Sequence, residues 1–217
     1  MKIGILGSGT VGQSLAAGLL KAGNEIRLGT GHPMKEELVA WASRHKAGDC
    51  ITTFAQAAAF GDPVFLCTNW TGTESAIKQS GTALEGKVVV DVTNPLDGKG
   101  PDALGRLSFA DVHGASGGVL VQQWLPDSKV VKALNSIGSL HMDHPAFSEG
   151  KPTMFVAGNA DQAKKSVTHI LHELGWEDVV DVGGIEMSDS LEELCRLWCA
   201  YGFRTGTWTH AFSLLRK

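Results

Sequence analysis

The sequence predicts a doubly wound α/β fold, in which a mostly parallel sheet is covered by helices on both faces. Short runs of valine, isoleucine and leucine alternate with helix-like stretches along most of the 217 residues. This pattern is expected of strands buried on both faces of a parallel sheet. The first run also leads into a glycine-rich turn, GSGTVG at residues 7–12, which stands between a predicted strand and a predicted helix. Such a turn is typical of open sheets that bind dinucleotides.

Each element follows from its own apolar pattern. Apolar residues at helical spacing, such as Leu15 and Leu19, mark the helices, whereas continuous apolar runs bounded by glycine, proline or polar residues mark the strands. The expected strands span residues 2–7, 24–29, 50–54, 63–68, 87–93, 129–136, 152–158 and 177–183. The expected helices span residues 11–22, 34–47, 72–84, 119–125 and 161–175, with an alanine-rich stretch at 55–61.

Two regions depart from this alternation. Residues 97–118 hold six glycines and show no clear period, and a loop of this length in a compact domain is usually functional or mobile.

We expect a dinucleotide-binding Rossmann-like domain over residues 1–185 and a small C-terminal helical segment over residues 186–217. Ser188 or Ser190 is expected to cap that segment. Its apolar face contains Leu191, Leu194, Cys195, Trp198 and Tyr201, and the apolar positions continue at Trp208, Phe212 and Leu215.

The composition excludes several classes of protein. A net charge of -4 gives no electrostatic footprint for nucleic acid, and no apolar run approaches the length that spans a bilayer. The N-terminus enters a strand without a cleavage signature, so we expect no signal peptide and a cytoplasmic location. The four cysteines lie in apolar segments and are expected to be free, buried thiols rather than disulfides or metal ligands.

Each glycine of the turn has a physical task. Gly7 permits the tight turn, Gly9 lets the backbone approach a pyrophosphate, and Gly12 lets the helix pack closely on the strand. Thr10 and Val11 then open the helix, whose first N–H groups and positive dipole end face the phosphates. The glycine spacing alone is weak evidence for a nucleotide site, but the position of the turn between a strand and a helix favours dinucleotide binding.

The segment EIRLGTGHP at residues 25–33 predicts which dinucleotide binds. An acidic residue at the end of the second strand would bind the ribose 2′-OH of NAD and would repel the 2′-phosphate of NADP. This strand end carries no carboxylate, so we expect NADP(H) rather than NAD(H). The groups placed to hold the phosphate are the Thr30 hydroxyl, the Gly29 and Gly31 N–H groups, and the side chains of His32 and Lys35.

Further candidate residues follow the later strands, because ligands of doubly wound sheets bind at the carboxyl ends of strands. One set should border the pyrophosphate and the ribose, and another should face the nicotinamide, where an apolar residue beside a glycine leaves room for a second ring. The first set contains Thr68, Asn69, Trp70 and Asn94, and the second contains Asn135, Ile137 and Gly138. Packing by Trp70 and turn capping by Asn135 are the alternative roles.

The chain resembles the NADPH:F420 oxidoreductase family, whose fold is also used by the cytosolic domain of the STEAP metalloreductases. The resemblance is carried by the first 31 residues, VFLCTNW, VVKALNSIG and the DSLEELCRLW tail. It implies that NADP(H) binds in an extended form and exchanges hydride with a flavin-type ring such as coenzyme F420, without a protein nucleophile. The family commonly has Ser and Arg after the second strand, where this chain has Thr30 and His32.

Two other functions stay open from the sequence. Lys132 and Asn135 superficially suit a reductase of a small carbonyl or imine, although such enzymes usually add a large helical domain. A protein that binds NADP(H) as a sensor or partner subunit is the third reading. No catalytic side chain is assigned, since ring-to-ring hydride transfer needs proximity and a dry site more than a proton relay, and His113 is interpreted as a loop histidine. The apolar stripe of Leu191, Leu194, Trp198 and Tyr201 predicts a homodimer.

Overall fold

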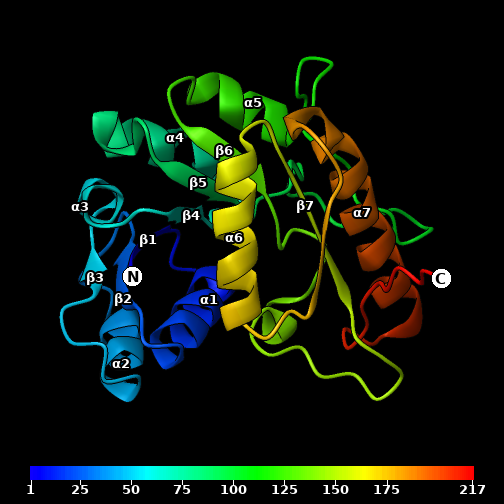
Figure 1. Cartoon of the computed structure of the whole chain (residues 1–217), viewed down its shortest axis with the longest axis horizontal. Helices are drawn as coiled ribbons and strands as arrows, with labels where there is room; N and C mark the ends of the chain where they lie inside the picture. Colours follow the sequence, from blue (N-terminus) through cyan, green and yellow to red (C-terminus); the bar gives the residue numbers. More distant parts are fainter.

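The structure is a computed structural model that describes all 217 residues, and its centre is a single eight-stranded sheet (Figure 1). The strand order is β3-β2-β1-β4-β5-β6-β7-β8, and neighbours are parallel except for β6 and β7. The predicted doubly wound, mostly parallel fold is therefore confirmed. The strands are β1 (Lys2–Leu6), β2 (Glu25–Gly29), β3 (Ile51–Thr52), β4 (Val64–Leu66), β5 (Val88–Asp91), β6 (Lys129–Lys132), β7 (Thr153–Gly158) and β8 (Asp178–Asp181).

Helices cover both faces of the sheet and enclose two separate apolar cores. The helices are α1 (Thr10–Lys21), α2 (Glu36–Arg44), α3 (Phe54–Phe60), α4 (Trp70–Ser80), α5 (Gly117–Trp124), α6 (Asp161–Glu173) and α7 (Ser188–Thr205). Side chains of α1, α2 and α6 share one core, whereas side chains of α3, α4 and α5 share the other. No helix is both long enough and apolar enough to cross a membrane.

The two cores explain why the strands read as continuous apolar runs. In β4, Phe65 packs into the core with α1 and α6, while Val64 and Leu66 pack into the core with α3 and α4. Successive side chains of a strand point to opposite faces, so a strand covered on both sides must be apolar at every position.

The order in which strands are added to the sheet reverses between β1 and β4, although the two strands are parallel. After β1 the chain builds β2 and β3 on one side, and it then returns to place β4 and all later strands on the other side. The loops that leave β1 and β4 therefore diverge, and a crevice opens between them at the carboxyl edge of the sheet. In open α/β sheets this switch point is where ligands bind.

The C-terminal segment differs from the prediction in two respects. Helix α7 ends at Thr205, where Gly206 adopts a left-handed conformation with φ of 69°, so residues 206–217 are not helical. They run back to β7, where the Thr153 N–H donates to the Phe212 carbonyl. The expected serine cap is also wrong: Met187 is the N-cap residue and no side chain caps the helix. A short 3-10 turn, η3 (Ile185–Met187), leads directly into α7, and the Ser188 hydroxyl donates to Ile185 O within it.

Candidate functional site

The glycine turn joins β1 to α1, and its three glycines are required for different reasons. Gly7 has φ of +121°, and a Cβ there would lie 2.6 Å from the Cys67 carbonyl. A Cβ on Gly12 would lie 1.8 Å from the Gly7 carbonyl oxygen, so this glycine permits the helix to pack on the turn. A Cβ on Gly9 would meet nothing within 4 Å. The fold itself therefore does not require a glycine at position 9, whereas a bound pyrophosphate would.

The end of β2 forms a small polar site with the glycine turn. The Thr30 hydroxyl accepts hydrogen bonds from the Ser8 hydroxyl at 3.0 Å and from the His32 N–H at 3.3 Å. Thr30 is buried, whereas the side chains of His32 and Lys35 are exposed. Lys35 is paired with Glu37, which reduces its role in the predicted phosphate site. Ser8 was not predicted, because a serine between the glycines of such a turn carries no signal of its own.

A cavity of about 340 Å³ opens beside α1 at the carboxyl ends of β4 and β5. It contains Val11 and four of the residues predicted from the strand ends, so the structure brings these together as expected. The segment after β5 contributes more lining residues than the sequence suggested. The lining residues are Val11, Cys67, Thr68, Asn69, Trp70, Thr71, Val92, Thr93, Asn94, Leu96 and Gly98.

The β4 side of this cavity is held by capping interactions. The Asn69 side chain is the N-cap of α4 and accepts from the Gly72 N–H at 3.2 Å. The Thr68 hydroxyl bonds the buried Thr73 hydroxyl at 2.9 Å. Trp70 stacks on Trp124 with ring centroids 5.6 Å apart. These contacts give the three predicted residues structural roles and leave the N–H groups of the first turn of α4 directed toward the carboxyl edge of the sheet.

Asn94 and Asn135 form a reciprocal pair at the ends of β5 and β6. The Asn94 side-chain amide donates to the Asn135 carbonyl at 2.8 Å, and the Asn135 amide donates to Asn94 Oδ1 at 2.9 Å and to the Leu191 carbonyl at 2.8 Å. Asn135 is therefore tied both to the cavity wall and to α7. The sequence placed these residues at neighbouring strand ends but could not show that α7 joins them.

The space expected beside Gly138 is filled by the chain itself. A Cβ on Gly138 would lie 3.0 Å from the Trp198 ring of α7, and Ile137 is buried in the core shared by α1 and α6. Open room for a second ring at this glycine was therefore a wrong expectation, because no local pattern indicated that Trp198 folds over it. Trp198 in turn stacks on His210, with ring centroids 4.6 Å apart, so the C-terminal residues complete this wall.

No side chain at the cavity is suited to act as a nucleophile or proton donor. Burial, with a smaller contribution from the Asp91 carboxylate, raises the pKa of the Cys67 thiol well above its ordinary value, so the sulfur stays protonated. Lys132 is fully buried, and its ammonium group is 2.9 Å from Asp91 and 2.8 Å from Glu192. It therefore cannot reach a substrate as the carbonyl-reductase hypothesis requires. His113 is exposed on its loop beside Asp111.

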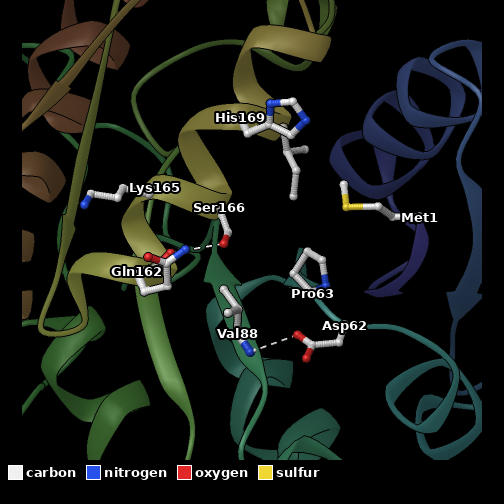
Figure 2. Close-up of a pocket in the computed structure, with 9 residues that line it drawn as sticks. Met1, Asp62, Pro63, Val88, Gln162, Lys165, Ser166 and His169 are labelled. Atoms are coloured by element: carbon white, nitrogen blue, oxygen red, sulfur yellow. Dashed lines mark hydrogen bonds between the residues drawn. The ribbon is translucent and has the colours of Figure 1, made fainter.

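A second cavity, of about 440 Å³, lies at the opposite edge of the sheet (Figure 2). Val88 begins β5 and Pro63 precedes β4, so this cavity faces the amino ends of the strands. The Val88 N–H donates to Asp62, and the Lys165 side chain points away from the cavity (Figure 2). No glycine turn adjoins it, and ligands of doubly wound sheets bind at the other, carboxyl edge. Its lining residues are Met1, Asp62, Pro63, Val88, Gln162, Lys165, Ser166, His169 and Ile170.

The fold and the site together define a dinucleotide-binding protein of the doubly wound class. Comparison with known proteins identifies the family within this class. The sequence profile described as NADP oxidoreductase coenzyme F420-dependent matches residues 2–95. The F420-dependent NADP reductase of Methanocaldococcus jannaschii is 31% identical over 208 residues, which cover 91% of this chain and 90% of that protein. The chain therefore belongs to the family of F420-dependent NADP reductases, which are oxidoreductases.

Two further relatives agree with this assignment. The crystal structure of a protein assigned as an F420-dependent NADP reductase from Arthrobacter sp. FB24 has a TM-score of 0.91 and 32% identity, and each chain is covered completely. Metalloreductase STEAP3 of Rattus norvegicus is 25% identical over 89% of this chain, which corresponds to 36% of that longer protein. The family resemblance of the sequence is thus confirmed.

Proposed function

We propose that this protein transfers hydride between NADP(H) and a flavin-type ring, with coenzyme F420 as the acceptor. Family membership carries the proposal, because a relative that matches over nearly the whole chain is named an F420-dependent NADP reductase. The site supports it, since a glycine turn with an open Gly9 adjoins a cavity at the switch point of the sheet. The bound dinucleotide supplies the hydride chemistry, and the protein supplies binding and orientation.

The residues present fit an extended dinucleotide. The pyrophosphate would lie over Gly9, where the first N–H groups of α1 have no intrahelical acceptor. The adenosine ribose would lie beside Thr30 and Ser8 at the end of β2, on one side of β1. The nicotinamide half would extend to the other side of β1, into the cavity between Thr68 and Asn94. Apolar side chains such as Val11 and Val92 exclude water from that end.

The absence of an acid–base pair in the cavity is consistent with this reaction. Transfer between stacked rings needs the reacting atoms about 3–3.5 Å apart and needs no proton relay. Lys132, the side chain that favoured a carbonyl or imine substrate, is enclosed between two carboxylates. No observation on the structure now favours that second reading over hydride transfer to a ring.

NADP(H) is expected to bind more tightly than NAD(H), because no carboxylate at the end of β2 repels a 2′-phosphate. Substitution of Thr30 by aspartate should lower the affinity for NADP⁺ by about tenfold or more, through charge repulsion and loss of a hydroxyl donor. The affinity for NAD⁺ should be unchanged or improved. Titration calorimetry with both nucleotides measures this, and equal affinities in the wild-type protein would show that the strand end has been misinterpreted.

We also propose that the protein is a homodimer in the cytoplasm. The apolar stripe of α7, from which the dimer was predicted, is only partly exposed, since Leu191 and Trp198 are buried within the chain. Leu197, Tyr201 and Phe203 on α7 remain 59%, 50% and 42% exposed, and they support association through this helix. Four free, buried cysteines support a reducing compartment.

Light scattering is expected to give the mass of a dimer at micromolar concentration. Leu197→Glu should shift the mass to that of a monomer, because a charge would be buried in the interface. Leu140→Glu is the matched control, since Leu140 is 80% exposed on a different segment. A monomeric wild-type protein would refute the proposed association.

A further inference from the structure

A buried ionic network lies behind the cavity and connects three distant parts of the chain. The Lys132 ammonium donates to Asp91 Oδ2 at 2.9 Å, to the Thr93 carbonyl at 2.7 Å and to Glu192 Oε1 at 2.8 Å. All three of its N–H bonds are thus used, and Lys132, Asp91 and Glu192 are each no more than 1% exposed. Burial alone would lower the pKa of Lys132, but the two carboxylates hold it above its ordinary value.

Glu192 has a second set of partners at the start of α5. Its Oε2 accepts from the Gly117 N–H at 3.0 Å, and its Oε1 accepts from the Gly118 N–H at 2.9 Å. The carboxylate therefore caps the positive end of that helix while it binds Lys132. Neither position has room for a larger residue beside α7, because a Cβ on Gly117 would lie 3.0 Å from Glu192 Oε1 and a Cβ on Gly118 would lie 2.2 Å from Ser188 Oγ.

The network ends on Thr93, which lines the cavity. The Thr93 carbonyl accepts from Lys132, while its N–H and hydroxyl donate to Asp91 Oδ1 at 2.9 and 2.7 Å. Thr93 is therefore held at three atoms, all of them within the buried network. Asn94 follows directly and is bonded to Asn135, whose amide also reaches α7 at the Leu191 carbonyl. The path from Glu192 to the cavity thus consists of two consecutive hydrogen bonds through Lys132.

We propose that Glu192 is a positioning residue for the nicotinamide end of the dinucleotide. It acts through Lys132, which holds the Thr93–Asn94 wall, and it makes α7 part of the cofactor site although α7 does not line the cavity. The proposal rests on the proposed function, in which the nicotinamide half occupies this cavity. Two buried carboxylates around one lysine are costly to desolvate, and a network that is fully hydrogen-bonded rigidifies the groups it joins.

The test compares two ligands that share one end. Adenosine 2′,5′-bisphosphate has only the part expected to lie over the glycine turn and Thr30, whereas NADPH also reaches the wall at Thr93. In Glu192→Gln, one side-chain N–H group would face the Lys132 ammonium or a glycine N–H, so the network must shift. The dissociation constant of NADPH should rise by about tenfold, while that of the bisphosphate should stay within about twofold.

Glu193→Gln is the matched control, because Glu193 is exposed and pairs only with Arg196 on the surface. It removes the same charge from the neighbouring position and should leave both dissociation constants unchanged. If Glu192→Gln does not fold, Glu192→Asp, which keeps the charge but shortens its reach, is measured in the same way.

The proposal is overturned if neither constant changes, or if both rise in proportion, or if both Glu192 variants fail to fold, since the role would then be absent or purely structural. Failure of the proposed cofactor assignment is distinguishable, because the wild-type protein would then not bind the bisphosphate at all.

Discussion

Substitution of Gly9 by valine is expected to abolish binding of NADPH and NADH while leaving the fold intact. The Cβ position of Gly9 is open in the free protein, with no atom within 4 Å. The valine side chain would occupy the space over the turn that a pyrophosphate needs. Affinity for either nucleotide should fall by about a hundredfold or more, a loss of about 3 kcal/mol. Fluorescence titration of NADPH measures this, alongside thermal unfolding.

Gly12→Ala serves as the contrasting control within the same turn. Its Cβ would lie 1.8 Å from the Gly7 carbonyl oxygen, so the helix must move away from the strand. We expect this variant to lose about 1–3 kcal/mol of stability or more, whereas Gly9→Val should change the free energy of unfolding by no more than about 1 kcal/mol. Retained NADPH binding in folded Gly9→Val would show that the pyrophosphate does not cross this turn.

Lys132→Met is expected to produce the largest loss of stability. Methionine has a similar length but no charge, so Asp91 and Glu192 would be left buried without a cation. Breaking a buried ion pair in this way costs about 3–5 kcal/mol. Denaturant unfolding with circular dichroism measures the change. Since a proton can neutralise an orphaned carboxylate, the loss should be smaller at acidic pH than at neutral pH.

Lys165→Met is the matched control for this prediction, because Lys165 lies on the exposed side of α6 and makes no ion pair. It should change the free energy of unfolding by less than about 0.5 kcal/mol. Equal stability of the two variants would mean that the buried network contributes no more to the free energy of unfolding than a surface lysine does. The ion pair between Lys132 and Glu192 would then not be what holds α7 on the sheet.

Local patterns in the sequence were sufficient to predict most of the fold. The strands are apolar at every position because both faces are covered, and the glycine turn lies where a strand meets a helix. The position of Thr68, Asn69, Trp70 and Asn94 around one cavity was also predictable, since they follow strands whose carboxyl ends share one edge. The absence of a carboxylate at the end of β2 is visible in the sequence itself, because the residues concerned follow the glycine turn by one helix and one short strand.

Contacts between distant segments were not predictable from periodicity. The sequence suggested that Trp198 faces a partner, whereas it covers Gly138 of the same chain. No local pattern indicated that Glu192 is buried against Lys132 and the start of α5. Both contacts were missed for one reason: an apolar or charged position in a helix does not show which part of the fold it meets. The glycine pair at residues 117–118 was the available signal for a close approach.

Oxidation of NADPH by a panel of acceptors tests the central claim most directly. The purified protein is incubated with NADPH and with F420, FMN, FAD or small carbonyl and imine compounds at equal concentration, and the loss of NADPH absorbance is followed. We predict that F420 reacts at least about tenfold faster than any carbonyl or imine, a difference in barrier of about 1.4 kcal/mol. Reaction with carbonyl or imine compounds alone, or tight NADPH binding with no turnover of any ring acceptor, would contradict the proposed function.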